Sequence, residues 1–290
     1  MSGGCTSRHS SVHSRRFDKA STPTLLASVA ELQMNFHQHW SLLRSPFAAV
    51  ATQDAFYSGT PQREAIARLD YMVRSASRSA IMLSHRGCGA TTLLKQLAGT
   101  SGLGGAAVQA VMTSGGVNSR RAAMARLAVA LAVDPFADRL PQRIEETIRA
   151  TGRSQVKTLW LIDRCDAPTA EAAATLASSS ISLAIVLGTT LENATSLQDA
   201  LDFCPLRIDL DAFRLDDTIN YVRYAVAAAG AKSQLFEDSA IVRLHELSDG
   251  RIAMIAAMAE LALLAAANAG SPTVTVSFVE AVQNELVRAA

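Results

Sequence analysis

Two glycines and two threonines lie close together in the segment SHRGCGATTLL, residues 84–94. The segment follows the apolar run SAIMLS and precedes a helical pattern, which predicts a turn between a buried strand and a helix. Glycines in such a turn let backbone N–H groups converge on phosphate oxygens at the helix N-terminus. Loops of the type G-x-x-x-x-G-K-[ST] add a lysine for the β- and γ-phosphates and a hydroxyl for Mg²⁺.

The segment departs from that pattern at its charged position. Ser84 stands at the first glycine, Ala90 at the lysine and Thr91 at the hydroxyl. The residues that could surround a phosphate group are Arg86, Gly87, Cys88, Gly89, Ala90, Thr91 and Thr92. Degenerate glycine patterns also occur in ordinary strand-to-helix turns. The segment alone therefore leaves two alternatives, a nucleotide site without its lysine and a plain turn.

A second chemical signal is the acid that ends the run LWLID, Asp163. An aspartate after a buried strand lies near the magnesium ion of P-loop NTPases. Ligands bind outside the carboxyl ends of parallel strands, so Thr91 and Asp163 are predicted to meet there and to hold Mg²⁺. Thr189, at the end of another apolar run, is a candidate contact for the terminal phosphate.

The elements that would position these residues alternate along the chain. Apolar runs predict strands at 78–84, 106–112, 157–167, 181–190 and 205–210, with helical patterns between them. Continuous apolar strands separated by helices predict a parallel sheet covered on both faces, an α/β fold. A helix before the first strand is expected to have Thr60 as its N-cap and Pro61 at its first position.

Past residue 213 the strand signal stops, and three helical segments end near glycine before a final helix. The first residues differ from the rest because they are rich in serine, arginine and histidine and nearly free of acids. The predicted organisation is a disordered basic tail at 1–40, an α/β core at 41–212 and a helical domain at 213–290.

Composition excludes several classes of protein. The formal net charge is +1, so nucleic acid is not indicated as a partner. The four cysteines, Cys5, Cys88, Cys165 and Cys204, are too scattered for a disulfide framework or a zinc site, which favours a cytoplasmic location. Cys88 and Cys165 are expected to fill space rather than to form a redox pair. The longest apolar run, from residue 252, carries Glu260 and predicts a buried helix, not a membrane span.

Four segments in order resemble the AAA+ ATPases of the general secretion pathway protein A (ExeA-like) family. They are SPFAAVATQDAFYSGTPQREAIARLDYMV from residue 45, the loop at 84–94, LWLIDRCD, and the helical region from residue 213. The resemblance implies a P-loop NTPase AAA+ core with a C-terminal helical lid, and ATP or ADP with Mg²⁺ as cofactors. It also implies protein partners, in a homo-oligomer or in a secretion or assembly complex.

The departures from this family concern charge. Family members have a lysine at Ala90, a glutamate at Arg164 and an arginine at Ala253. The lost lysine removes a charge-assisted contact worth about 1.5–3 kcal/mol, and the lost glutamate removes the group that orients the attacking water. We therefore expect nucleotide binding with weak or absent ATP hydrolysis, in an assembly or conformational component. A scaffold that binds no nucleotide and an active ATPase with a rearranged site are the alternatives.

The arginine after Asp163 has two interpretations. Arg164, or Arg86 in the loop, could carry the charge that the lysine would supply, because a guanidinium suits phosphate geometry. The alternative is that Arg164 points to solvent or pairs with Asp166. Asp166 itself lies three residues beyond Asp163 and is not expected to replace the glutamate.

Overall fold

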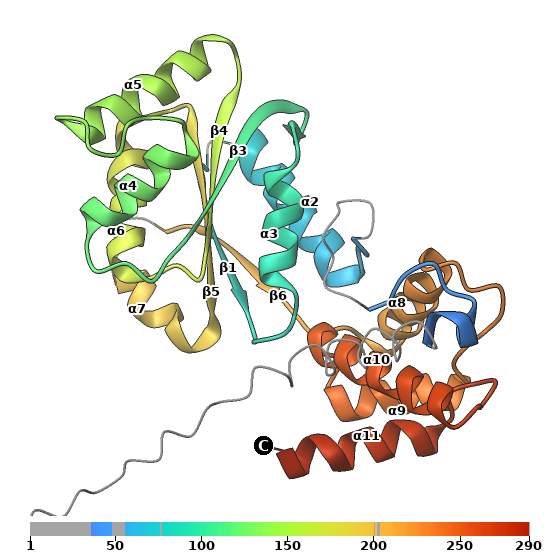
Figure 1. Cartoon of the computed structure of the whole chain (residues 1–290). Coiled ribbons are helices and arrows are strands. Elements are labelled where there is room, and N and C mark those ends of the chain that lie inside the picture. Colours follow the sequence, from blue (N-terminus) through green and yellow to red (C-terminus); the bar gives the residue numbers. More distant parts are fainter. Residues whose placement is uncertain (1–35, 48–55, 76, 200, 202–203, 290) are drawn as a thin grey trace, which may run out of the picture.

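Parallel strands form the central sheet of the computed structural model, which describes residues 36–47, 56–75, 77–199, 201 and 204–289. The strands are β1 (Ser79–Ser84), β2 (Gly102–Leu103), β3 (Ala106–Ser114), β4 (Lys157–Asp163), β5 (Leu183–Thr190) and β6 (Leu206–Leu210). Their order is β2-β3-β4-β5-β1-β6, and only the β2–β3 pair is antiparallel (Figure 1). The predicted parallel sheet is confirmed, and the short edge strand β2 is an addition to it.

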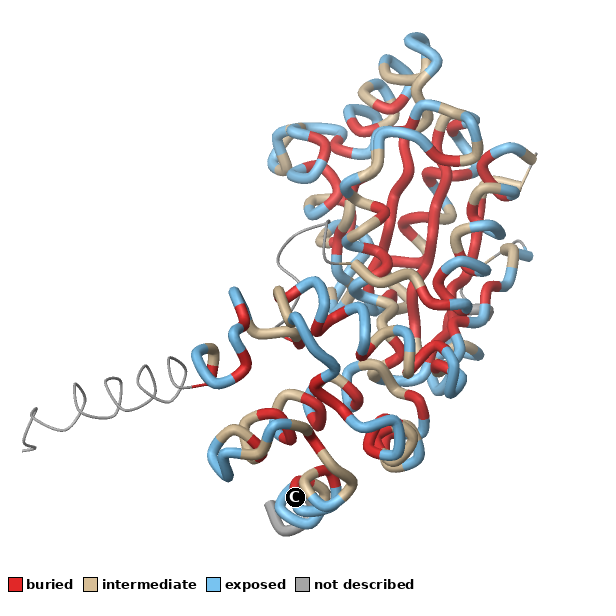
Figure 2. The backbone as a smooth tube through the Cα atoms, turned by 90° about the vertical axis from the view of Figure 1, so that its right-hand side faces the viewer, coloured by how far each residue is buried: buried red, intermediate tan, exposed pale blue. Residues whose placement is uncertain are grey.

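Helices cover both faces of this sheet (Figure 1). One face carries α2 (Thr60–Arg74) and α3 (Ala90–Ala98), and the other carries α4 (Arg120–Ala130), α5 (Leu140–Arg153), α6 (Ala167–Ser179) and α7 (Ala194–Asp199). Neighbouring strand residues alternate between the two cores: Met82 packs with α2 and α3, whereas Ile81 belongs to the opposite face. The central strands β1, β4 and β5 are buried along almost their whole length, as the red stretches in the interior of Figure 2 indicate, whereas β2, β3 and β6 also carry exposed residues.

Helix α2 begins one residue earlier than predicted. Thr60 is its first residue and Gly59 is the N-cap, so Thr60 is not a cap. The backbone N–H and the hydroxyl of Thr60 donate to Asp217 Oδ1 at 2.8 and 2.9 Å. Asp217 lies in α8 (Leu215–Ala228), so an acid from the helical domain satisfies the start of α2 in place of a local side chain.

The helical domain consists of α8, α9 (Asp238–Ser248), α10 (Ile252–Asn268) and α11 (Val276–Ala289), with its own apolar core. The predicted helices are confirmed, and α10 is the apolar run from residue 252. It buries Ile255 and Met258, while Glu260 accepts hydrogen bonds from the Ser45 hydroxyl and from Phe47 N–H. Within the described residues, every helix is too short or too polar to cross a bilayer.

The segment 36–47 packs on the helical domain. Its buried side chains Phe36, Trp40, Leu42 and Phe47 belong to the core of that domain. The indole Nε1 of Trp40 donates to the Leu263 carbonyl at 3.2 Å. Residues 36–40 are helical, so the predicted tail at 1–40 is wrong at its C-terminal end, and residues 1–35 lie outside the described part. Phe36 and Trp40 are four residues apart and therefore share one helix face. This spacing indicates a short amphipathic helix within an otherwise polar stretch.

Replacing Trp40 by alanine is expected to lower the free energy of unfolding by about 3–5 kcal/mol, because a buried ring and its hydrogen bond are lost. Urea unfolding followed by circular dichroism measures the change. Leu43→Ala is the matched control, since Leu43 is 87% exposed. The chain has two tryptophans, so Trp160→Phe leaves Trp40 fluorescence as a reporter of the helical domain. Equal stability of Trp40→Ala and Leu43→Ala would contradict this placement.

Candidate functional site

The turn between β1 and α3 exposes a helix N-terminus. Gly87 and Gly89 have φ of +88° and +92°, a left-handed conformation that glycine adopts without strain. Helix α3 starts directly after Gly89, and Leu93 N–H donates to the Gly89 carbonyl at 2.9 Å. The N–H groups that precede Leu93 have no acceptor within the helix, by helix geometry. Such a terminus attracts anions.

A pocket of about 550 Å³ lies in front of this turn, and we call it the β1–α3 pocket. Of the residues singled out by the sequence, those that line it are Arg86, Gly87, Gly89, Ala90, Thr91, Thr92, Asp163, Arg164 and Thr189. Cys88 is buried instead, and burial raises the pKa of its thiol. Burial also raises the pKa of Cys165, which lines the pocket. Both thiols are therefore protonated at neutral pH, which does not support a redox pair.

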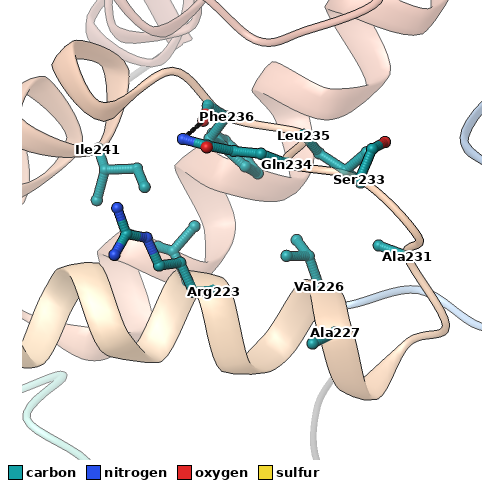
Figure 3. Close-up of a pocket in the computed structure, with 10 residues that line it drawn as sticks. Arg223, Val226, Ala227, Ala231, Ser233, Gln234, Leu235, Phe236 and Ile241 are labelled. Atoms are coloured by element: carbon teal, nitrogen blue, oxygen red, sulfur yellow. Dashed lines mark hydrogen bonds between the residues drawn. The ribbon is translucent and has the colours of Figure 1, made fainter.

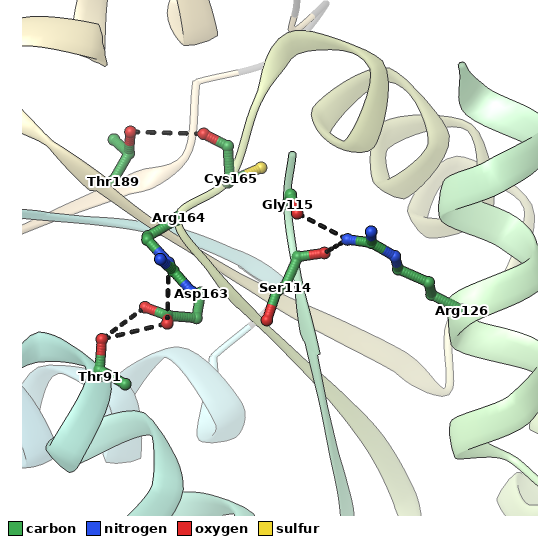
Figure 4. A network of polar contacts seen from close by, with 8 residues as sticks. All are labelled: Thr91, Ser114, Gly115, Arg126, Asp163, Arg164, Cys165 and Thr189. Atoms are coloured by element: carbon green, nitrogen blue, oxygen red, sulfur yellow. Dashed lines mark hydrogen bonds and ion pairs between the residues drawn. The ribbon is translucent and has the colours of Figure 1, made fainter. Parts of the chain in front are cut away.

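Thr91 and Asp163 are in contact within this pocket (Figure 4). The Thr91 hydroxyl lies 3.0 Å from Oδ1 and 3.1 Å from Oδ2 of Asp163. Among the residues that the structure describes, Asp163 is the only acid that lines the pocket. In the same part of the chain, no three or more His, Cys, Asp or Glu side chains are grouped so that they could hold a metal ion by themselves. One carboxylate and one hydroxyl suit Mg²⁺, which keeps several waters and takes further ligands from phosphates.

The Arg164 side chain pairs with Asp163 and not with Asp166 (Figure 4). Its Nε lies 3.6 Å from Asp163 Oδ2, and the arginine side chain is 80% exposed whereas that of Asp163 is 6% exposed. Of the two expected alternatives, an Arg164–Asp166 pair is therefore wrong, whereas a solvent-exposed Arg164 side chain agrees with the structure. Arg86 also lines the pocket and is exposed. The β1–α3 pocket thus holds two guanidinium groups, although neither stands at the position of the missing lysine.

Asp166 has a structural role at the start of α6. Its carboxylate accepts hydrogen bonds from the N–H groups of Gly116 at 2.9 Å, Val117 at 2.8 Å and Thr169 at 3.2 Å, and from the Thr169 hydroxyl. Burial by itself would raise the pKa of this carboxyl, but the hydrogen bonds from Thr169, Val117 and Gly116 outweigh it and lower the pKa. Asp166 is thereby committed to holding the loop after β3 against α6.

The two threonines at the end of β5 differ in what they contact. The Thr189 hydroxyl donates to the Cys165 carbonyl at 3.5 Å. The Thr190 hydroxyl is buried and has no hydrogen-bond partner among the described residues, and Thr190 lines the pocket. The Thr190 hydroxyl is thus buried beside the pocket with its hydrogen-bonding capacity unused. Asn193, which follows in the next turn, also lines the pocket, and no sequence signal pointed to it.

The helical domain reaches the pocket through the start of α10. Ala253 lines the pocket, and its backbone N–H donates to the Gly87 carbonyl at 3.0 Å. Ala253, the position at which the ExeA-like family is expected to have an arginine, thus lies next to the loop and brings no charge to it. Arg251 does not replace it, since its guanidinium donates to the Ser248 carbonyl at 3.1 Å and lies 3.4 Å from Asp249.

A smaller cavity of about 170 Å³ lies in the helical domain between α8 and α9 (Figure 3). Two of its polar side chains, those of Arg223 and Gln234, already have protein partners. Arg223 pairs with Asp238 at 2.9 Å, and Gln234 donates to the Phe236 carbonyl at 2.8 Å. The remaining lining is mostly apolar, so this cavity lacks the convergent polar groups of a catalytic or phosphate site.

Solved structures of low sequence identity share this fold. The Drosophila ORC bound to DNA aligns with a TM-score of 0.61 at 16% identity, over 98% of this chain and 70% of that chain. The Aeropyrum pernix ORC1 protein in complex with DNA aligns at 0.59 and 14% identity, over 80% and 67% of the two chains. The Aeropyrum pernix ORC2 protein in ADPNP–ADP complexes aligns at 0.58 and 13%, over 83% and 71%.

These similarities confirm the predicted fold, a P-loop NTPase AAA+ core with a parallel sheet and C-terminal helices. No protein-family model matches the sequence, and no curated protein matches it. The ExeA-like resemblance therefore stays a prediction. Two of the three structures are DNA complexes, so the expectation that nucleic acid is not indicated is not supported. Identities this low establish the fold and leave function to the site.

Replacing Asp166 by alanine is expected to lower the free energy of unfolding by about 1–2 kcal/mol, because a helix cap and two loop N–H groups lose their acceptor. The pKa of Asp166 is lowered in the fold, so its contribution is complete above the ordinary value of 3.8 and is lost as the pH falls through the folded value. Urea unfolding at neutral and acid pH measures this. Asp166→Asn, which keeps a side-chain acceptor, is the control. A constant difference between wild type and Asp166→Ala at all pH values contradicts the assignment.

Proposed function

We propose that this chain is an ExeA-like AAA+ protein that binds ATP or ADP with Mg²⁺ and hydrolyses ATP weakly or not at all. The observation that carries the proposal is the contact of Thr91 with Asp163 inside the β1–α3 pocket. The Thr91 hydroxyl and the Asp163 carboxylate come from different elements, α3 and β4, and meet at the N-terminus of a helix behind a glycine turn. This contact is not required for an ordinary turn between a strand and a helix, so it favours the nucleotide site.

The residues that would hold the nucleotide belong to the turn and to the strand ends. Backbone N–H groups of the turn at Gly87 and Gly89 and of the first residues of α3 would face the phosphates, and Thr91 and Asp163 would hold Mg²⁺. When bound, the ion would neutralise charge on the terminal phosphates. The unpartnered hydroxyl of Thr190 would contact the outermost phosphate. The solved complexes of the similar ORC2 protein with ADPNP and ADP support this choice of ligand.

Hydrolysis is disfavoured by what the pocket lacks. Within the described part of the chain Asp163 is its only acid, and that carboxylate is engaged by Thr91 and Arg164, so no second carboxylate from this part lines the pocket to orient a water. Ala90 and Ala253 bring no charge to the phosphates. Positioning and charge stabilisation supply nearly all of the acceleration in phosphoryl transfer. Nucleotide binding, which draws on many backbone contacts, tolerates these losses better than turnover does.

The proposed role is that of an assembly or conformational component in the cytoplasm, with protein partners or further copies of the chain. Ala253 N–H bonds the Gly87 carbonyl, so a ligand at the turn acts directly on the first residues of α10. The helical domain would then report occupancy of the pocket to a partner. Association with DNA is the second candidate function, favoured by the two similar structures that contain DNA. Anisotropy of labelled duplex DNA, with and without nucleotide, tests it.

Mg·ADP is expected to raise the melting temperature of the full chain, because a ligand that binds only the folded state stabilises it by mass action. Thr91→Val and Asp163→Asn are expected to reduce this shift, since each removes one of the two side chains that would hold the ion. Thr147→Val is the matched control and should keep the shift, because Thr147 is a half-buried threonine of α5 that does not line the pocket. A wild-type chain without a shift at saturating nucleotide would support the scaffold alternative and refute the proposal.

Phosphate release from ATP is expected to be slow in the wild-type chain and to rise at least about tenfold in Ala90→Lys with Arg164→Glu, because the pair restores the phosphate cation and the water-orienting acid. Ala90→Lys alone should tighten binding without a comparable gain in rate. A malachite-green assay with Asp163→Ala as the background control measures release. Fast wild-type release that disappears in Asp163→Ala would favour the active ATPase instead.

A further inference from the structure

The backbone of Arg164 is held in an unusual conformation. Its φ is +50°, in the left-handed region that non-glycine residues rarely adopt. Two flanking strands impose it, since Gly115 N–H donates to the Asp163 carbonyl at 2.8 Å and Cys165 N–H donates to the Gly188 carbonyl at 2.7 Å. A Cβ on Gly115 would lie 2.0 Å from the Arg164 carbonyl oxygen, so this close approach requires glycine. These backbone contacts therefore set the direction in which the Arg164 side chain leaves the main chain.

That direction brings the guanidinium to the carboxylate of Asp163. The Nε–Oδ2 distance is 3.6 Å, and Thr91 approaches the same carboxylate from the other side (Figure 4). Among the described residues Asp163 is the single acid of the β1–α3 pocket, and the guanidinium of Arg164 lies next to its charge. A divalent ion at Asp163 would come close to this guanidinium, and like charges at such distances repel.

We infer that Arg164 is a built-in counter-ion of Asp163 that competes with Mg²⁺, so that the pocket binds nucleoside phosphates with little dependence on the metal. The inference rests on the proposed nucleotide site and adds its metal dependence. A guanidinium beside the phosphates also takes over part of the charge neutralisation that the ion would supply, and its planar donors suit phosphate oxygens.

The competition between Arg164 and Mg²⁺ for Asp163 is reversible, because the Arg164 side chain has space for a second position. It also lines an open cavity of about 820 Å³ next to α4. The other cation there, Arg126, is engaged with the carbonyls of Ser114 and Gly115 at 2.6 Å each. Arg164 can thus leave Asp163 without a steric clash, and high Mg²⁺ is expected to displace it.

The first test measures ADP affinity of the full chain by calorimetry, with Mg²⁺ and with EDTA. Removal of Mg²⁺ is expected to weaken ADP binding by the wild type less than about fivefold. The same removal is expected to weaken ADP binding by Arg164→Ala by a further factor of roughly five to ten, which is the scale of one exposed charge interaction with a divalent ion. Arg86→Ala is the matched control, because it removes the same charge from the same pocket away from Asp163. It should weaken binding in both buffers and leave their ratio unchanged. Equal ratios in wild type and Arg164→Ala overturn the inference.

The second test needs no nucleotide and so separates this inference from the proposed function. Mn²⁺ binding to the free protein, followed by electron paramagnetic resonance, is expected to be roughly five to ten times tighter in Arg164→Ala than in the wild type. Adding Asp163→Asn to Arg164→Ala should abolish that gain. Equal Mn²⁺ binding in wild type and Arg164→Ala, including none in either, overturns the competition. Absence of ADP binding together with the Mn²⁺ difference would refute the nucleotide site and leave the counter-ion role intact.

Discussion

The contact between the Thr91 hydroxyl and the Asp163 carboxylate joins the start of α3 to the end of β4. It can form only if the turn after β1 folds back with its glycines in the left-handed region and if β4 lies close to β1 in a parallel sheet. The strand order β4-β5-β1 satisfies that requirement. A buried acid with few partners is costly, so this carboxylate needs both the hydroxyl and the adjacent guanidinium. The chemistry of the pocket follows from the balance of these three groups.

Charge at the pocket is arranged differently from the arrangement that the resemblance implies. The family places a cation in the loop and a second acid after the strand, whereas this chain has Ala90 in the loop and Arg164 after the strand. The guanidinium of Arg164 therefore lies beside the carboxylate of Asp163, whereas the loop has no charge at Ala90. Such a site retains attraction for an anion and loses the group that would activate water. This separation of binding from turnover is the basis of the proposed role as an assembly component.

Hydrogen bonds join the helical domain to the α/β core. Asp217 Oδ1 of α8 accepts from the backbone N–H of Thr60, the first residue of α2. A second contact, in which Ala253 N–H donates to the Gly87 carbonyl, ends on the glycine turn itself. Each joins segments that are far apart in sequence. A change in the turn is thus transmitted to α10 by a direct hydrogen bond, without a chain of side chains between them.

The sequence by itself determined the parallel sheet, the helical domain and the strand ends that carry Thr91 and Asp163, because hydrophobic periodicity and glycine turns are local signals. It did not reveal β2 or the burial of Phe36 and Trp40, whose signals are short or depend on distant partners. Only the tertiary structure decided that Arg164 faces Asp163 and not Asp166, since its backbone is held by Gly115 and Gly188 from two other segments. It also decided that the Thr190 hydroxyl, and not that of Thr189, is without a partner. Side-chain pairing at a site depends on contacts across the sheet, and no local pattern encodes them.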